Sequence, residues 1–285
     1  MKRARAVILG AVGIVLLGVI WELYKAVAPA AGVVIGGVTI LPRSTDLAMP
    51  HLGLMFTRLG QPVLSDPASG PLWVAVFQAA GFTLGIAAVS WVIGVAVGML
   101  LAVLMQRFRT AESALAPWII LSQTVPIIAL APLVSGAGSQ IPGWQDWMSA
   151  AVIASYLAFF PVSIGALRGL ASPDTASLEL MTSYAVGWWQ TLLRLRLPAS
   201  VPYLLPALRL AAASAVIGTV VAEVSLGLEG GVGRMMIEFA SASSGDPAKP
   251  FGPIFGAIAI GLTAAGIVAL LGLTLRKYRR GEVAP

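Results

Sequence analysis

Runs of apolar residues about 20 positions long, enough to cross the hydrocarbon core of a bilayer as an α-helix, recur along the chain. Six of them stand out, at about residues 6–28, within 72–106, and at about 115–134, 147–167, 203–222 and 252–275. The run 72–106 is too long for one perpendicular crossing, so its early part is expected to be a tilted or interfacial lead-in. The pattern predicts an all-α membrane protein with six transmembrane helices.

The composition agrees with a surface that faces lipid. Hydrophobic residues make up 58% of the 285 positions and charged residues only 11%, whereas soluble proteins carry roughly a quarter charged residues. With no cysteine and a single histidine, His51, we expect no disulfide, no metal site and no catalytic residue. His51 itself is expected to be an exposed residue without a ligand role.

The first run, 1–28, is expected to be a retained transmembrane helix. Its apolar stretch is longer than the roughly 7–15 residues usual for a signal peptide. Trp21, Tyr24 and Lys25 at its far end are typical of an anchor at the membrane–water interface.

The basic residues predict the orientation of the spans, because cytoplasmic loops are enriched in Lys and Arg. With the N-terminus inside, both termini are cytoplasmic, 29–71 is extracytoplasmic, and 276–285 is a basic cytoplasmic tail. The charge thus reports orientation, and we expect no nucleic-acid partner. Twelve of the eighteen basic residues then lie inside: Lys2, Arg3, Arg5, Arg107, Arg109, Arg168, Arg194, Arg196, Arg276, Lys277, Arg279 and Arg280.

Several predicted spans carry small residues at a spacing that lets helix backbones approach closely in lipid. We expect these residues to pack helices within one bundle, with dimerisation as the alternative. They are the pairs Gly81 and Gly85, Gly94 and Gly98, and Gly252 and Gly256.

The predicted cytoplasmic stretch 171–201 does not have the composition of a simple loop. Its tripeptide Ser172-Pro173-Asp174 favours a helix start, with serine as the cap, proline in the first turn and aspartate at the positive end of the dipole. The chain is expected to bend around Tyr184-Ala185-Val186-Gly187, because Gly187 is a helix breaker. A second short helix is expected from Trp188 to Leu195, ended by Pro198.

Three aromatic residues of this stretch, Tyr184, Trp188 and Trp189, lie at or beyond the predicted membrane surface. They fit an interfacial aromatic belt. They equally fit a knob that docks into a cytoplasmic partner, since aromatic and arginine side chains dominate protein interfaces.

The same stretch resembles the cytoplasmic loop of bacterial ABC-importer permeases, whose pattern is Glu-Ala-Ala, three residues, Gly, nine residues, Ile, any residue, Leu-Pro. Glu179 takes the glutamate position, and Leu180 and Met181 replace the two alanines. Ala185 replaces the glycine. The nine-residue spacer then leads to the closing motif Leu195-Arg196-Leu197-Pro198.

Flanking motifs resemble the nitrate/sulfonate/taurine-type branch of these permeases. The ten-residue interval between Glu223 and Gly233 resembles permeases for riboflavin or pyrimidine-precursor uptake. The resemblance covers roughly 72–275, the permease core, and leaves 29–71 unassigned apart from its Leu-Pro element. The matching motifs are Gln123-Thr124-Val125-Pro126, Ala129-Leu130-Ala131-Pro132, Phe160-Pro161, Val221-Ala222-Glu223, Gly231-Val232-Gly233 and Ile40-Leu41-Pro42.

The resemblance implies a fold like that of type I ABC-importer permeases, in the inner membrane of a prokaryote. It implies a permease subunit that forms the path for a small organic solute, such as riboflavin, hydroxymethylpyrimidine, a sulfonate, taurine or nitrate. An extracytoplasmic binding protein would deliver the solute, a second permease subunit would complete a homodimer, and cytoplasmic ATPase subunits would bind ATP and Mg. The chain has no phosphate-binding Gly-x-x-x-x-Gly-Lys-Ser/Thr loop, so we expect no cofactor in it and no enzymatic activity.

Two sets of candidate site residues are expected. The coupling set follows from the resemblance, and the pathway set from polar groups at membrane depth, which usually face the bundle interior. Pro126 is expected to break its span and free backbone carbonyls. Glu179 could instead be a solvated helix-surface carboxylate, the polar residues near Pro126 could form interhelical hydrogen bonds, and Glu223 could gate, bind the delivery protein or cap its span. The expected ATPase-coupling residues are Asp174, Glu179, Ser183, Tyr184, Ala185, Gly187, Trp188, Trp189, Arg194, Arg196 and Pro198. The candidates for the translocation pathway are Ser122, Gln123, Thr124, Pro126 and Glu223.

The alternative function is an ion-coupled secondary transporter or a channel. Proton- or sodium-coupled carriers generally need acidic residues at mid-membrane depth. None of the twelve acidic residues is expected there, which favours the ATP-coupled permease.

Overall fold

The computed structural model describes residues 2–64 and 66–274, which divide into two compact units. The first unit comprises residues 1–77 and 236–255, and the second comprises 78–235 and 256–285. The predicted basic tail, 276–285, lies outside the described residues.

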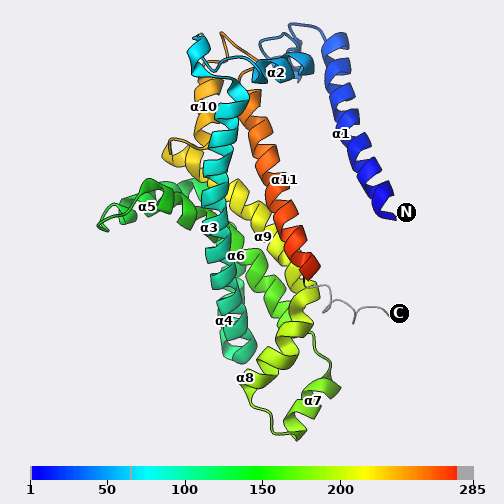
Figure 1. Ribbon diagram of the computed structural model, residues 1–285, viewed down its shortest axis with the longest axis vertical. Helices are drawn as coiled ribbons and strands as arrows, with labels where there is room; N and C mark the ends of the chain where they lie inside the picture. The colour runs from blue at the N-terminus through cyan, green and yellow to red at the C-terminus, as the bar shows by residue number, and fades with distance from the viewer. Residues whose placement is uncertain (1, 65, 275–285) are drawn as a thin grey trace. The chain divides into compact units, whose positions relative to one another are not determined.

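Helices dominate both units (Figure 1). Five helices of the described chain are long and apolar enough to cross a bilayer, and the number rises to six when one sharply bent helix pair is taken as a single span. The prediction of an all-α membrane protein is confirmed. The five are α1 (Lys2–Val27), α3 (Leu72–Arg107), α6 (Asp146–Leu170), α9 (Leu197–Leu226) and α11 (Phe251–Thr274), and the bent pair is α4 (Arg109–Ser122) with α5 (Ile127–Gly138).

The long apolar run forms one continuous helix, α3, of 36 residues. At about 1.5 Å per residue its length is about 54 Å, well beyond the roughly 30 Å of the hydrocarbon core. The predicted lead-in is therefore an extension of the membrane-spanning helix itself.

The third predicted span, 115–134, is wrong as a straight helix. Helix α4 ends at Ser122, α5 begins at Ile127, and their axes differ by 104°. The break expected at Pro126 is confirmed, because this residue lies directly before α5 with an extended backbone. Its nitrogen carries no N–H, so it cannot donate the hydrogen bond that would continue α4.

Pro198 does not end a helix, contrary to the prediction. Helix α8 (Trp188–Thr191), the π-helical turn η2 (Leu192–Arg196) and α9 follow without interruption, so the apolar span runs from Trp188 to Leu226. A π-turn widens the helix by one residue. The missing N–H and the ring of Pro198 come directly after this widened turn, where they do not break the helix.

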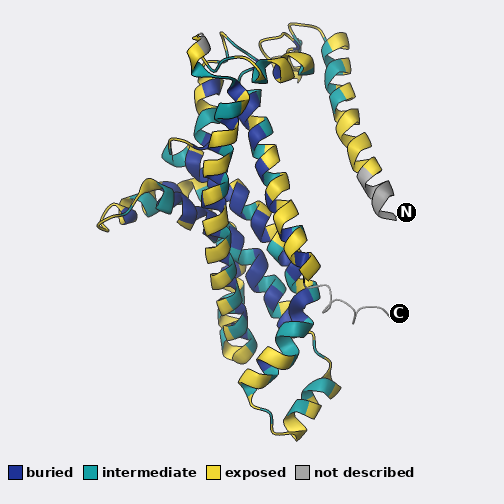
Figure 2. Ribbon diagram, in the orientation of Figure 1, coloured by how far each residue is buried: buried dark blue, intermediate teal, exposed yellow. Residues whose placement is uncertain are grey.

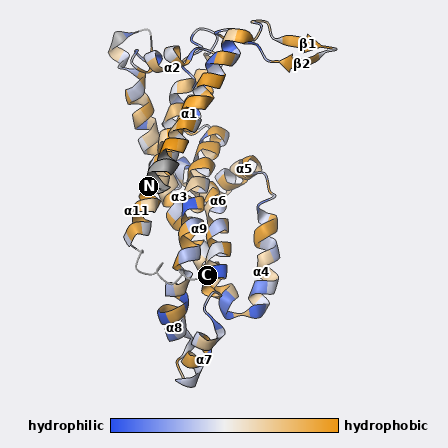
Figure 3. Cartoon of the chain, turned by 90° about the vertical axis from the view of Figure 1, so that its right-hand side faces the viewer, coloured by the Kyte–Doolittle hydropathy of each residue, from blue (hydrophilic) through white to orange (hydrophobic). Residues whose placement is uncertain are grey.

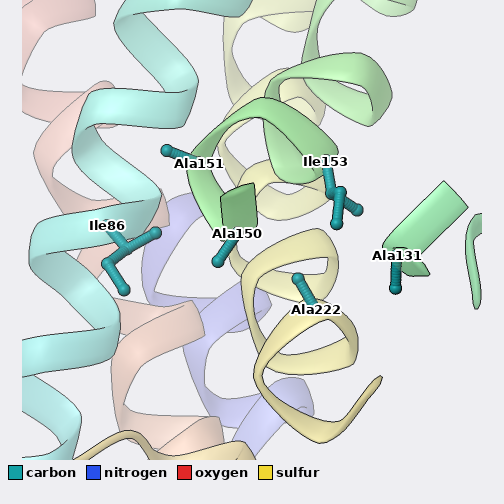
Figure 4. Close-up of a cluster of buried hydrophobic side chains, with 6 residues drawn as sticks. All are labelled: Ile86, Ala131, Ala150, Ala151, Ile153 and Ala222. Atoms are coloured by element: carbon teal, nitrogen blue, oxygen red, sulfur yellow. The ribbon is translucent and has the colours of Figure 1, made fainter. Parts of the chain in front are cut away.

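The core of the second unit is built from small side chains. One cluster joins α3, α5, α6 and α9 through Ile86, Ala131, Ala150, Ala151, Ile153 and Ala222 (Figure 4). Helices α6 and α9 are the most heavily buried elements of this unit (Figure 2). Their backbones approach so closely that a Cβ at Gly218 would lie 2.8 Å from the Cα of Ala154, and one at Gly169 would lie 2.8 Å from the Cβ of Ser200.

The predicted glycine pairs have different environments. A Cβ at Gly94 or Gly98 would meet the backbone of α6 at 2.6–3.1 Å, so this pair packs α3 on α6 as predicted. A Cβ at Gly81 or Gly85 would meet no other atom of the described residues within 4 Å. In the first unit, a Cβ at Gly252 would meet Leu72 at 3.0 Å.

In the first unit, the end of α1 is fixed to the segment that precedes α2 (Leu52–Leu59). Glu22 accepts a hydrogen bond from the first backbone N–H of α2, that of Leu52, at 2.7 Å, and Trp21 Nε1 donates to the Pro50 carbonyl at 3.0 Å. His51 Nδ1 lies 2.8 Å from Glu22 Oε2. His51 is exposed, as expected, and pairs with this carboxylate at the surface.

The remaining elements are short. The first unit holds the hairpin strands β1 (Val33–Ile35) and β2 (Val38–Leu41) and the 3₁₀ turn η1 (Pro67–Ser69). Helix α7 (Thr175–Ser183) belongs to the second unit and lies, with α8, beyond the ends of α6 and α9 (Figures 1 and 3). Helix α10 (Val232–Ser241) follows the glycine-rich turn after α9.

Candidate functional site

Helix α7 presents its whole surface outside the core, because none of its residues is buried. Asp174 is the N-cap and accepts a hydrogen bond from the Ser177 backbone N–H at 3.3 Å. The predicted cap, Ser172, instead donates from its hydroxyl to the Gly169 carbonyl, at 2.7 Å, near the end of α6. Glu179 and Ser183 are both exposed on α7.

The turn that ends α7 depends on Ala185. The Val186 N–H donates to the Met181 carbonyl and the Ala185 N–H donates to the Thr182 carbonyl, both at 2.9 Å. These two bonds form a Schellman motif, which requires a left-handed residue at the position of Ala185. Its φ is +52°, and no other non-glycine residue of the described chain has a positive φ.

The bend expected around Tyr184-Ala185-Val186-Gly187 is present between α7 and α8, but Gly187 does not cause it, because its φ is −65° and it only precedes α8. A glycine in the left-handed position costs little, whereas alanine places its Cβ against the following carbonyl. The sequence shows alanine at position 185, where the loop pattern has glycine. It does not show that this alanine adopts the left-handed conformation.

The three aromatic residues of the turn have different environments. Trp188 is half-buried, packs against the cluster of Ala102, Ala166, Leu170 and Leu192, and lies with its ring 5.2 Å from the Arg107 guanidinium. Tyr184 and Trp189 are 75% and 66% exposed. Trp188 thus holds the loop on the bundle, while Tyr184 and Trp189 are presented outward.

The two arginines after α8 differ in the same way. Arg196 Nη1 donates to the Leu170 carbonyl at 2.8 Å, a group left without a partner by the end of α6. Arg194 is exposed. The expected docking role of Trp188 and Arg196 therefore does not fit their positions, because both side chains are engaged within the chain, whereas Arg194 is free to meet an acidic partner.

The polar groups at the α4–α5 break are satisfied nearby. The Ser122 carbonyl, exposed by the break, accepts a hydrogen bond from the Tyr156 hydroxyl of α6. Ser122 Oγ donates to the Ile119 carbonyl at 2.7 Å, Thr124 Oγ1 donates to the Leu121 carbonyl at 2.8 Å, and Gln123 Nε2 donates to Ser122 Oγ at 3.3 Å. Ser122 therefore fits the alternative of interhelical hydrogen bonding, since its carbonyl bonds to Tyr156 of α6. Thr124 and Pro126 remain exposed.

Glu223 is fully buried near the end of α9. Its Oε1 accepts from the Thr83 hydroxyl of α3 at 2.8 Å, and its Oε2 accepts from the Gly233 N–H at 2.8 Å. The Thr83 hydroxyl accepts in turn from the Val232 N–H at 3.0 Å. The carboxylate thus lies at the N-terminus of α10, where backbone donors and the helix dipole favour an anion.

The glycines after α9 make room for this carboxylate. A Cβ at Gly231 would collide with the Glu223 carboxyl group, and one at Gly233 would lie 2.9 Å from its Cβ. Glu223 therefore joins α3, α9 and α10 and cannot contact a passing solute in this conformation, so its assignment to the pathway is not consistent with its burial. The ten-residue spacing between Glu223 and Gly233 could be read from the sequence. The contact of Glu223 with Thr83, 140 positions away, could not.

A bundle of apolar helices with an exposed, separately capped helix between two of its spans defines a multi-span membrane protein. Residues 94–277 match the family described as binding-protein-dependent transport system inner membrane component. The chain belongs to this family, and it is the transmembrane permease component of an ABC importer. The resemblance seen in the loop and its flanking motifs is confirmed.

Named relatives cover much or all of the chain. It is 30% identical to the formylaminopyrimidine transport permease protein ThiX of Halalkalibacterium halodurans, over 99% of this chain and 100% of that protein. It is 28% identical to the putative aliphatic sulfonates transport permease protein SsuC of Bacillus subtilis, over 90% and 86%. It is 30% identical to the riboflavin transport system permease protein RibX of Chloroflexus aurantiacus, over 44% of each chain.

A solved structure shares the fold. The crystal structure of an amino acid ABC transporter with histidines matches with a TM-score of 0.55 at 17% identity, over 72% of this chain and 94% of that chain. The likeness agrees with the predicted permease fold.

Replacing Ala185 by glycine is expected to stabilise the end of α7. The change removes the left-handed penalty of alanine, about 1 kcal/mol, or about a fivefold gain in local amide protection. Ala176→Gly, at an exposed position inside the same helix, should have the opposite effect, a loss of about 1 kcal/mol. Hydrogen exchange of 175–186 measures both, and equal effects of the two variants would contradict the strained turn.

Truncating Glu223 is expected to lower the stability of the fold, and any loss of transport should follow from that lower stability. Glu223→Gln keeps the size of the side chain but turns an amide N–H₂ toward a donor, a loss of about 1–2 kcal/mol. Glu223→Ala leaves two buried donors and a cavity, a loss of about 3 kcal/mol or more. Thr83→Ser, which keeps the hydroxyl, is the mild control.

The free energy of unfolding, measured for each variant purified in detergent, ranks these losses of stability. If Glu223→Ala kept wild-type stability while abolishing uptake, Glu223 would act on the solute instead.

Proposed function

We propose that this permease is coupled to a cytoplasmic ATPase through α7 and the turn that follows it. The observation that carries the proposal is the separation of roles in this loop. Leu180, Tyr184 and Trp189 are unburied and uncovered by the described chain, whereas Trp188 and Arg196 fix the loop to the bundle. Exposed aromatic groups on a rigid support are the usual anchors of a protein interface.

The charges of the loop suit an ATPase surface of mixed sign. Glu179 lies on α7, and exposed Arg194 lies one turn beyond Trp189. On this proposal the ATP and Mg are bound by the partner ATPase, and α7 occupies a groove of that subunit. Closure of the ATPases would then move the loop as a rigid body.

A second copy of the chain would complete the pathway as a homodimer. The face of α3 around Gly81 and Gly85 supports this arrangement, because both glycines are exposed within the part of the chain that the structure describes. A hollow of about 310 Å³ lies there, lined by Phe82, Ile86, Val89 and Trp147 beside the two glycines. Small residues of this kind allow close approach of a helix from another subunit.

The proposed cargo is a pyrimidine vitamin precursor, delivered by an extracytoplasmic binding protein across the inner membrane of a prokaryote with both termini of the chain in the cytoplasm. The full-length match to a formylaminopyrimidine permease supports this class over the sulfonates of the second relative. The polar groups at the α4–α5 break, Ser122, Gln123 and Thr124, carry no charge, which suits a neutral heteroaromatic solute.

Removing the two outward aromatic side chains together, Tyr184→Ala with Trp189→Ala, is expected to weaken ATPase association. Two interface anchors of this size are worth at least about 2 kcal/mol, or about 30-fold in affinity. Co-purification with the ATPase, and uptake of formylaminopyrimidine by proteoliposomes holding ATPase and binding protein, should fall together.

Trp118→Ala is the matched control, because Trp118 is equally exposed but lies on α4. Normal association and uptake in the double variant would refute the docking role. Loss of association with both variants would indicate a general defect.

A further inference from the structure

The hairpin β1–β2 of the first unit has a well-defined backbone. Its strands pair antiparallel, with Val34 opposite Thr39 and Ile35 opposite Val38. The turn consists of Gly36 and Gly37, both left-handed with φ of 60° and 81°. Such a two-residue turn matches the twist of paired strands, so the hairpin is a specific structure in a segment that the family resemblance left unassigned.

Exposed apolar side chains lie on both faces of this hairpin, and Thr39, opposite Val34, is the one polar side chain of its two strands. The strands accordingly carry mostly hydrophobic residues in Figure 3. Ile35 and Val38, a cross-strand pair on one face, are 63% and 66% exposed, and Val34 on the opposite face is 60% exposed. Neither strand has a buried residue. A hairpin bathed in water normally keeps at least one polar face, and contiguous exposed apolar surface marks a contact site.

The base of the hairpin is fixed to the end of α1. The Tyr24 hydroxyl donates to the Pro42 carbonyl at 2.9 Å, and Ser44 Oγ donates to the Ala28 carbonyl at 2.9 Å. Lys25 Nζ lies 2.6 Å from Asp46 Oδ1, and this ammonium lowers the pKa of the Asp46 carboxyl group.

This attachment determines the depth of the hairpin. The apolar window of α1 ends at Val27, and no charged residue occurs from 26 to 42. The hairpin therefore starts where the chain leaves the hydrocarbon core, at the level of the lipid headgroups.

We propose that the hairpin inserts into the bilayer interface at the C-terminal end of α1, with lipid in contact with both of its faces. A docked protein would cover one face and leave the other in water, whereas lipid surrounds both. At headgroup depth, water still reaches the outward N–H and C=O groups of the two strand edges, which could not be left unpaired in the hydrocarbon core. This anchoring is independent of the ATPase and of the solute.

Spin labels on the full-length protein test the proposal, and the absence of native cysteine makes single labelling clean. Val34→Cys and Val38→Cys report the two faces, in vesicles of phosphatidylcholine and phosphatidylglycerol. Leu17→Cys on α1 is the lipid reference, and Ser244→Cys, exposed in the loop after α10, is the water reference. Collision with oxygen, which enters lipid, is compared with collision with a water-soluble nickel chelate.

Both hairpin labels are expected to show an oxygen-to-nickel ratio between those of Leu17, in the middle of the apolar window of α1, and Ser244, and several-fold above that of Ser244. A ratio like that of Ser244 at either site would overturn the proposal. So would protection of one label from both reagents, which would indicate a second copy or another protein on that face.

A charge on the hairpin controls for the apolar nature of the label itself. Ile35→Lys in the Val34→Cys background should shift the ratio toward water. An unchanged ratio would mean that the label, and not the hairpin, enters the lipid, and this too would overturn the proposal.

Discussion

The close contact between α6 and α9 is the constraint on which the second unit depends. Within lipid there is no hydrophobic gain from joining helices, so association relies on van der Waals contact over large areas. Gly165, Gly169 and Gly218 leave no space for a Cβ between the two helices. Alanines and serines fill the rest of the contact, and the result is a seam with little freedom to slide.

The loop of residues 171–196, which we propose to dock on the ATPase, is inserted between these two helices. Residues 171–196 leave the end of α6 and return into α9, and Arg196 ties the return to the last carbonyl of α6. Trp188 and Arg107 tie the same region to α3. On the proposed docking, force applied to α7 would reach the tightly packed pair of α6 and α9. Glu223, near the other end of α9, links that pair to α3 and α10.

Much of this fold could be predicted because lipid imposes simple rules on sequence. Span positions followed from apolar length, and the break at Pro126 followed from a missing N–H. The sequence could not show that Pro198 continues a helix, since that depends on a π-turn formed by residues 192–196. The bend around residues 184–187 was assigned to Gly187 because glycine breaks helices. The Schellman hydrogen bonds instead place the left-handed residue at Ala185.

The candidate site was predicted less well, because its contacts join distant parts of the sequence. The loop pattern identified α7 and its outward residues, but separating Trp188 from Trp189 required knowledge of which face meets the bundle. Glu223 stood out by its spacing to Gly233, yet its role depends on Thr83, which no local pattern marks.

Rigid transmission from α7 to the α6–α9 pair is best tested by distances between paired spin labels in the complex with its ATPase. Thr175→Cys on α7 with Val152→Cys near the start of α6 reports motion within one chain, and Val152→Cys alone reports motion between two copies. On trapping with a non-hydrolysable ATP analogue, the distance within the chain should stay constant while the distance between copies changes. A shift in the distance between positions 175 and 152, with the distance between copies unchanged, would contradict rigid coupling.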